Sequence, residues 1–125
     1  MSNDNLDSAP YVSLATFKRS GEAVCTPVWS APADGAYYVF SAGNAGKVKR
    51  LRNSPKAQLA VCDVRGKLLG EWYEAHGEVL ASEEEIAVAL RALRAKYRVQ
   101  MWMADFFSKL TGKYNKRAYI RVRRV

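Results

Sequence analysis

The sequence predicts a mainly β protein of the α+β class, in which antiparallel strands close into a barrel. β-Branched and aromatic residues gather in about six short runs along the chain. Turn signals such as Asp34-Gly35 separate neighbouring runs closely enough to form hairpins. A sheet of this size commonly closes on itself, because closure removes the unpaired edges of its outer strands. Two to three helices are expected between the strands.

The first three strands are expected within the N-terminal third of the chain. Proline inside the second run, Pro27, has no N–H group to donate to a neighbouring strand. That run is therefore expected at a sheet edge, at a bulge, or beside something other than a strand. Gly21 and the Asp34-Gly35 pair supply the turns that make the three runs an antiparallel meander. The three runs are Tyr11–Phe17, Ala23–Ser30 and Ala36–Ser41.

The remaining strands follow a break in the sheet at Gly43–Gly46. A short helix is expected over Lys47–Asn53, because Ser54-Pro55 stops it. The strands expected after this helix are Lys56–Val64, Trp72–Leu80 and Ala118–Val125.

A longer helix is expected to begin after Ser82. Ser82 and Glu85 have the spacing of a capping box, and acidic residues suit the positive end of a helix. Its apolar residues Ile86, Leu90, Leu93 and Tyr97 recur at intervals of four, three and four, which gives one apolar stripe. A second helical stretch, rich in aromatic residues, is expected around Met101–Phe107.

Length and composition predict one domain over residues 1–125, with residues 1–9 frayed. No run approaches the roughly 18 apolar residues that span a bilayer, and the N-terminus lacks the pattern of a signal peptide. The chain is therefore expected in the cytoplasm and away from membranes. Cys25 and Cys62 lie in strand-like runs and are expected to be buried, inert thiols.

The formal net charge of +8 comes from 20 Lys and Arg against 12 Asp and Glu. The cations form two clusters, one over Lys47–Lys56 and one over Lys109–Arg124, and no acidic residue follows Asp105. Such clusters favour phosphate ligands, acidic small molecules or nucleic acid, although solubility alone is the other interpretation.

Residue-based catalysis has little support in the sequence. The single histidine, His76, is expected to be structural, and Glu83–Glu85 are explained by helix capping. There is no nucleophile elbow, no cluster with metal-ligand spacing and no dinucleotide fingerprint. The sequence therefore predicts neither a catalytic side chain nor a metal site.

The segment Ser41–Arg50 is the most informative for function. A strand ends there in small residues, and the next helix starts with lysines in its first turn. Lysines at that end are unfavourable, because their positive charge opposes the helix dipole. A phosphate bound there would reverse this, because both the lysines and the free N–H groups would then contact a negative charge. A phosphate site and a merely solvated basic helix are the two interpretations.

Several segments together resemble one known family over about Tyr11 to Tyr97. The sequence is similar to the deazaflavin (coenzyme F-420)-dependent enzymes of the pyridoxamine-phosphate-oxidase-like split β-barrel superfamily. The segments that carry the resemblance are Tyr11–Phe17, Thr26–Trp29, Gly46–Pro55 and Val61–Gly66.

The resemblance implies an FMN-binding-like split β-barrel homodimer with cofactor sites at the subunit interface. Members bind F-420 or FMN and transfer hydride to or from a small organic substrate, with no obligatory protein acid or base. Lys47 corresponds to a lysine on the cofactor phosphate, with Lys49 and Arg50 expected to assist it, and Gly46 belongs to the same loop.

The resemblance also implies which residues meet the rest of the cofactor. Thr26, Pro27, Val28 and Trp29 fall on the strand that backs the flavin ring, and Ser41 and Ala42 fall where a strand end meets the ring or its ribityl chain. The oxidase itself has arginine at the position of Gly46 and glutamine at that of Trp72, so oxidation of pyridoxamine phosphate is not expected.

Charge favours F-420 over FMN, because its phosphodiester and glutamate tail make F-420 the more anionic cofactor. A non-catalytic module that stores a flavin or tetrapyrrole is one alternative. A basic nucleic-acid-binding barrel is the last alternative, with Tyr114 and Tyr119 of the Lys109–Arg124 cluster stacking on bases. Nucleic acid is ranked lowest because Tyr119 is expected to be buried in the last strand.

Overall fold

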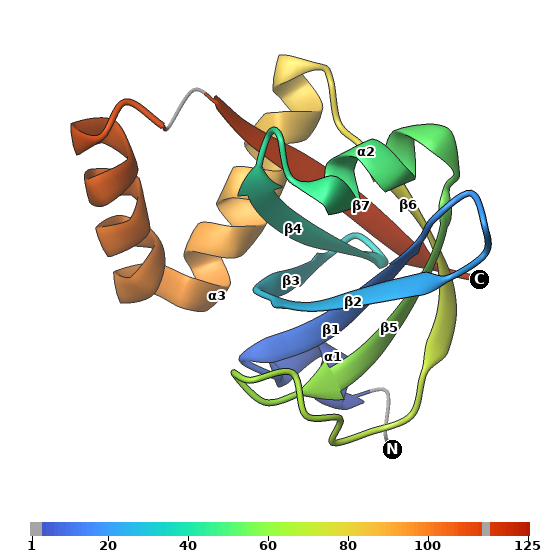
Figure 1. The fold of residues 1–125 in the computed structure, drawn as a ribbon. Helices are drawn as coiled ribbons and strands as arrows, with labels where there is room; N and C mark the ends of the chain where they lie inside the picture. Colours follow the sequence, from blue (N-terminus) through green and yellow to red (C-terminus); the bar gives the residue numbers. More distant parts are fainter. Residues whose placement is uncertain (1–3, 114–115) are drawn as a thin grey trace.

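A computed structural model describes residues 4–113 and 116–125 of the chain (Figure 1). These described residues form three helices and seven strands. They are α1 (Asp4–Ser8), β1 (Tyr11–Phe17), β2 (Ala23–Val28), β3 (Ser30–Ala33), β4 (Ala36–Ala42), α2 (Gly46–Asn53), β5 (Lys56–Cys62), β6 (Tyr73–Val79), α3 (Glu83–Leu110) and β7 (Arg117–Arg124).

The strands form one antiparallel sheet in the order β2-β1-β5-β6-β7-β4-β3. Its two edge strands, β2 and β3, are consecutive in sequence and are joined by Trp29 alone. The sheet must therefore curl until its two edges meet at Trp29, which produces a barrel that is split between these edges (Figure 1). The predicted antiparallel, mainly β fold is confirmed.

Both edge strands contain a proline. Pro27 of β2 faces Ser13 of β1, and Pro32 of β3 faces Tyr37 of β4. Each edge strand has a single strand partner in the sheet, so the proline can turn its missing N–H away from the ladder. The edge position expected for Pro27 is confirmed.

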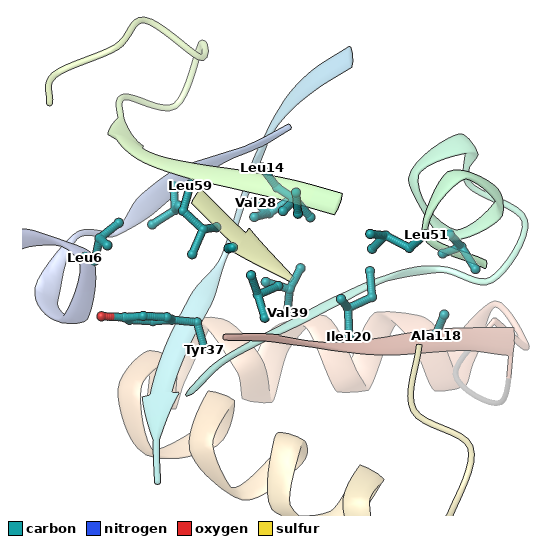
Figure 2. Close-up of a cluster of buried hydrophobic side chains, with 14 of the residues drawn as sticks. Leu6, Leu14, Val28, Tyr37, Val39, Leu51, Leu59, Ala118 and Ile120 are labelled. Carbon is teal, nitrogen blue, oxygen red and sulfur yellow. The ribbon is translucent and has the colours of Figure 1, made fainter. Parts of the chain in front are cut away.

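Apolar side chains from alternate strand positions fill the inside of the curled sheet (Figure 2). Leu14, Val39, Leu59 and Ile120 are fully buried there. Helix α2 covers the open side of this cluster through Val48 and Leu51, and a side chain at Gly77 would lie 3.1 Å from Leu51 Cδ2. Glycine at this position of β6 therefore lets α2 pack closely on the sheet.

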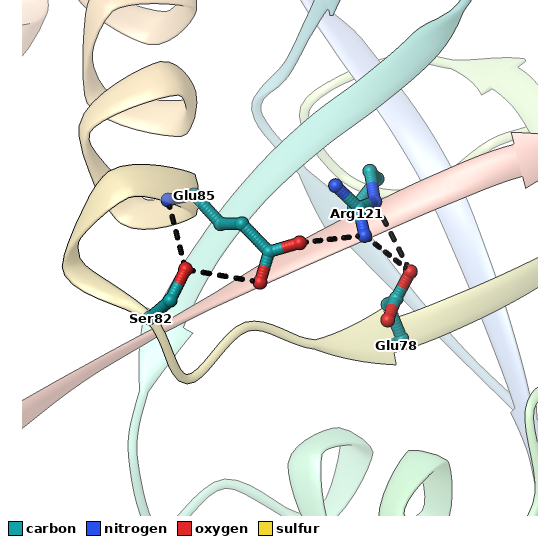
Figure 3. A network of polar contacts seen from close by, with 4 residues as sticks. All are labelled: Glu78, Ser82, Glu85 and Arg121. Atoms are coloured by element: carbon teal, nitrogen blue, oxygen red, sulfur yellow. Dashed lines mark hydrogen bonds and ion pairs between the residues drawn. The ribbon is translucent and has the colours of Figure 1, made fainter.

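Helix α3 packs on the outer face of the sheet and buries Leu93, Tyr97 and Met101. Ser82 caps it, because its hydroxyl accepts a hydrogen bond from the Glu85 N–H at 3.1 Å. Arg121 of β7 ties the same end to the sheet, with contacts of 2.7 Å to Glu78 and 2.9 Å to Glu85 (Figure 3). The serine cap expected at Ser82 is therefore confirmed.

The structure corrects several predicted elements. The run Ala23–Ser30 is divided at Trp29, so the sheet has seven strands instead of six. The two expected helices after Ser82 are one helix with a kink at Tyr97, whose φ and ψ are −109° and 24°. Cys62 is buried as expected, but Cys25 is exposed on the outer side of an edge strand.

The N-terminal segment contains an element that the sequence did not predict. Residues 4–8 form α1, where Leu6 is fully buried in the main core. Tyr37 donates a hydrogen bond of 2.6 Å to Asp7, which anchors the segment further.

Among the described residues, no helix is both long enough and apolar enough to cross a bilayer.

Candidate functional site

A cavity of about 360 Å³ lies where the two edges of the sheet separate. Strand β2 and the following Trp29 form one side of it, the end of β4 forms another, and the start of α2 closes one end. Its lining residues are Tyr11, Pro27, Val28, Trp29, Phe40, Ser41, Ala42, Ala45, Lys47 and Ala104.

The end of β4 is exposed to this cavity because β3 is shorter than β4. The ladder between them stops at the pair Ser30 and Val39, whereas β4 continues to Ala42 alongside β7. Phe40, Ser41 and Ala42 therefore have a strand partner on one side only. Backbone groups on their other edge can hydrogen-bond to a flat ligand in the cavity, as a strand end does in many binding sites.

Aromatic side chains fix the orientation of Trp29 at the cavity wall. Its ring lies edge-on to Phe40, with centroids 5.9 Å apart, and stacks on Tyr97 at 4.9 Å. The Tyr97 hydroxyl donates to the Pro10 carbonyl at 2.9 Å and accepts from the Ser30 N–H at 3.0 Å. Burial raises the pKa of Tyr97 to about 12, so this hydroxyl keeps its proton at neutral pH.

Lys47 lies in the first turn of α2, at the end of the cavity. Burial, followed by the nearby charge of Arg50, lowers the pKa of Lys47 below its ordinary value. Within the described chain, no hydrogen bond or ion pair to another residue offsets this cost. An anion in the cavity would offset it, because the ammonium would gain a charged partner.

The start of α2 is also free to accept an anion. Ala45, the residue before the helix, offers no side-chain oxygen to the first N–H groups, and the first turn holds no acidic residue. Unsatisfied N–H groups at a helix start attract negative charge. Lys47 and these N–H groups together suit the phosphate of a bound cofactor.

Arg50 folds back along α2 towards this same end. Its Nε donates to Thr16 Oγ1 at 2.7 Å, and its Nη1 lies 2.7 Å from the point that a Cβ at position 46 would occupy. Glycine at position 46 thus leaves room for the guanidinium beside Lys47. Arg50 adds positive potential at this end of the cavity, although it does not line the cavity.

Six of the ten residues predicted for the cofactor site line this one cavity. These six are Pro27, Val28, Trp29, Ser41, Ala42 and Lys47. Thr26, Gly46, Lys49 and Arg50 are not among the lining residues. The Thr26 hydroxyl is buried and has no hydrogen-bond partner among the described residues, and Lys49 faces solvent from α2.

The sequence did not single out four other lining residues, which are Tyr11, Phe40, Ala45 and Ala104. Phe40 could have been found from its position directly before Ser41. Ala104 carries no such signal, because it comes from the part of α3 that follows the kink at Tyr97.

Residues considered for other chemistry lie outside the cavity. His76 is exposed on β6 and lines a different groove, beside Arg123. Trp72 does not line the cavity either. The described part of the chain has no group of three or more His, Cys, Asp or Glu that could hold a metal ion. Tyr119 is buried, as expected, so it cannot stack on a base, and Tyr114 lies outside the described residues.

Three solved structures illustrate what the chain is similar to. A conserved hypothetical protein from Mycobacterium tuberculosis is 22% identical with a TM-score of 0.68, over 97% of this chain and 79% of that one. An FAD-binding protein from Mesorhizobium loti is 16% identical with a TM-score of 0.68, over 98% and 84%. The heme storage protein of Vibrio cholerae is 11% identical with a TM-score of 0.62, over 93% and 82%.

At these identities the structural matches establish the fold, and two of the matched proteins are described by a ligand they bind or store. No curated protein matches the sequence. The family model described as pyridoxamine 5'-phosphate oxidase matches residues 3–120, which is nearly the whole chain. The chain therefore belongs to the pyridoxamine 5'-phosphate oxidase family.

Proposed function

We propose that the protein is an oxidoreductase that binds coenzyme F-420 in the cavity between the sheet edges and transfers hydride between it and a small organic substrate. The observation that carries the proposal is the convergence of three segments on this cavity: Pro27–Trp29, Ser41–Ala42 and Lys47. A flat wall, a free strand edge and a cation at a helix start are the parts that a phosphate-bearing ring requires.

Each part has a distinct role in this proposal. Lys47 and the first N–H groups of α2 bind the phosphate, and Arg50 strengthens the positive potential around it. The Pro27–Trp29 wall orients the ring, and Tyr97 holds Trp29 in place. The cofactor supplies the hydride chemistry when bound, while the protein provides binding, orientation and exclusion of water.

The choice of F-420 rests on charge. The net charge of +8 favours the ligand with the greater number of negative groups. FMN is the alternative cofactor, and the FAD-binding relative from Mesorhizobium loti supports a flavin in this fold. Both cofactors place a phosphate on Lys47, so their distinction depends on the remaining anionic groups.

The proposal includes a homodimer that closes the cavity. The cavity of one subunit, of about 360 Å³, is open at the surface. Ligand sites commonly bury 70–90% of the surface of the ligand, so a second copy is needed to cover the open side. The C-terminal part of α3 supplies an apolar surface for a second copy. We call this surface the apolar arm; it consists of Val99, Trp102, Met103, Phe106, Phe107 and Leu110, which are 47–67% exposed.

Two observations favour a second copy as the occupant of the apolar arm. Six large apolar side chains over three helical turns approach the roughly 800 Å² that each partner buries in a standard interface. Ala104 lies on the same helical segment and lines the cavity, so a copy docked on the arm borders the cofactor site. Figure 1 shows this segment standing away from the sheet.

Storage of a tetrapyrrole is the second candidate, because one structural neighbour is a heme storage protein. The only imidazole in the chain, His76, lies in another groove and is not available to iron in this cavity. Steady oxidation of bound reduced cofactor by electron acceptors would favour the enzyme over a storage module.

Titration of the purified protein with F-420 and with FMN, followed by cofactor fluorescence, tests the proposal. We expect stoichiometric binding of at least one cofactor, with tighter binding of F-420. No binding of either cofactor at about tens of micromolar would overturn it. A resident cofactor binds with a Kd of about 1 μM or below, which corresponds to a binding free energy of about 8 kcal/mol or more.

A further inference from the structure

A second cavity, of about 610 Å³, adjoins the cofactor cavity. The two share the end of β4, so they are neighbours along one opening. Ser108, Lys113, Lys116 and Arg117 supply much of the rest of the lining of the second cavity. Its lining residues are Phe40, Ser41, Ala42, Gly43, Asn44, Ser108, Lys113, Lys116 and Arg117.

One wall of this cavity is held rigidly. The Arg117 guanidinium lies 4.7 Å from the Phe40 ring centre and donates to Asp105 Oδ1 at 2.8 Å and to Ser108 Oγ at 2.9 Å. Only 5% of the Arg117 side chain is exposed. Arg117 thus holds the Phe40 ring in a fixed position, and this ring, which lines both cavities, offers a preformed apolar surface to an aromatic or conjugated molecule.

A close backbone contact joins Gly43 to Lys116 in the lining of this cavity. The Gly43 N–H donates to the Lys116 carbonyl at 2.8 Å, and a Cβ at position 43 would lie 2.5 Å from that oxygen. Only glycine permits this approach. It fixes the backbone of Lys116 beside the end of β4.

The free charge in the cavity is positive. Asp105, the acidic residue beside it, is already paired with Arg94 and Arg117. Lys113 and Lys116 line the cavity, and among the described residues no carboxylate pairs with either ammonium group. Their charges therefore remain available to an anion, while the Phe40 wall offers apolar contact.

We propose that this second cavity binds the organic substrate, and that this substrate is a planar, conjugated molecule carrying a carboxylate. Phe40, held in place by Arg117, packs against the molecule, and Lys113 and Lys116 bind its carboxylate. This inference rests on the proposed function, since the shared strand end Phe40–Ala42 brings such a molecule next to the cofactor ring.

Calorimetry with cinnamate and with its neutral amide, cinnamamide, tests this on protein saturated with FMN. The two probes share a conjugated plane and differ in the carboxylate. We expect cinnamate to bind at least about tenfold more tightly, the value of a charge-assisted hydrogen bond. Added salt should reduce that difference, because the lysines are exposed. Equal affinities for the two probes would overturn the inference.

The variant Lys113→Gln/Lys116→Gln should lose about tenfold in cinnamate affinity and keep its affinity for FMN. Lys49→Gln/Lys67→Gln is the matched control, because it removes two exposed charges outside both cavities. Equal losses in both double variants would mean diffuse charge attraction and would overturn the inference.

A competition experiment separates the substrate from the cofactor tail as the source of the negative charge. Cinnamate should bind equally well to protein saturated with FMN and to protein saturated with F-420. Expulsion of cinnamate by F-420 alone would assign the cavity to the cofactor tail and overturn the inference. The cofactor titration is read separately, so failure of the cofactor to bind and failure of cinnamate to bind remain distinguishable.

Discussion

The indole of Trp29 stacks on the phenol ring of Tyr97 with centroids 4.9 Å apart and an interplanar angle of 12°. Trp29 is the point at which the two sheet edges meet, and Tyr97 is the point at which α3 bends. This contact therefore joins the closure of the barrel to the direction in which the second half of α3 leaves it. The wall of the proposed cofactor cavity and the apolar arm depend on the same pair of rings.

Tyr97→Phe should lower the free energy of unfolding by about 1–3 kcal/mol. The phenyl ring can keep the stack on Trp29, but the Ser30 N–H loses its buried acceptor. Urea denaturation followed by tryptophan fluorescence measures the loss. A stability equal to that of the parent protein would show that another group satisfies this N–H. Cofactor affinity should change little, since the hydroxyl does not line the cavity.

Lys96 should make the protein more stable as the pH rises from about 8 to about 10. Burial lowers the pKa of Lys96 to about 8, and its ammonium donates to the carbonyls of Ala9 at 2.7 Å and Ser30 at 2.6 Å. Between that pKa and the ordinary value, the unfolded chain holds a proton that the folded chain has released. The free energy of unfolding therefore increases with pH in this window.

Lys96→Met provides the comparison, because it removes this titration. Denaturant unfolding is measured at pH values of about 7.5, 8.5 and 9.5, which cover the window set by the shifted pKa. The free energy of unfolding should depend less on pH in the variant than in the parent protein. Parallel curves for both proteins would contradict the prediction. Measurements above pH 10 are avoided, because Tyr37 and Tyr97, with pKa values raised to about 12, reduce the stability there.

Lys47→Ala should weaken cofactor binding by about 1.5–3 kcal/mol, or roughly ten- to a hundredfold in Kd. Lys49→Ala is the matched control, since it makes the same change on the same helix at a side chain that faces solvent. Fluorescence titration measures both. Equal losses would mean diffuse attraction, and the phosphate would then lie elsewhere. Lys56 is less suitable as a control than Lys49, because its ammonium lies 4.6 Å from the Phe17 ring centre and its removal would also break this cation–π contact.

Trp102→Ser/Phe106→Ser should convert the proposed dimer into a monomer and weaken cofactor binding. These two rings stack on each other at 5.9 Å in the middle of the apolar arm. Leu69→Ser is the control, because Leu69 is also an exposed apolar residue but lies off the arm. Sedimentation velocity at micromolar concentration measures the change in mass. A parent protein that is monomeric with full cofactor affinity would refute the role given to the arm.

Local signals in the sequence predicted much of the fold. Strand β1 has the predicted bounds, and the turn at Asp34-Gly35 has the positive φ values, 51° and 78°, that such a pair favours. The cap at Ser82 was equally local. Each of these features is decided by residues within a few positions, so the sequence carries them directly.

Features that depend on distant contacts were missed. No glycine marks the division at Trp29, and the run from Ala23 to Ala33 passes from one sheet edge to the other without a turn. Helix α1 has five residues, and its order depends on the burial of Leu6 under the sheet. The second cavity was missed for the same reason, since Phe40 and Lys116 are brought together only by the pairing of β4 with β7.

The two prolines at the sheet edges limit how this protein can associate. Pro27 and Pro32 interrupt the rows of N–H donors on β2 and β3, so neither outer strand offers a continuous template for another chain. Domain swapping and fibril growth through added strands are both disfavoured. A second copy must instead bind through side chains. Single substitutions at such an interface can therefore change the affinity between copies without disturbing the barrel.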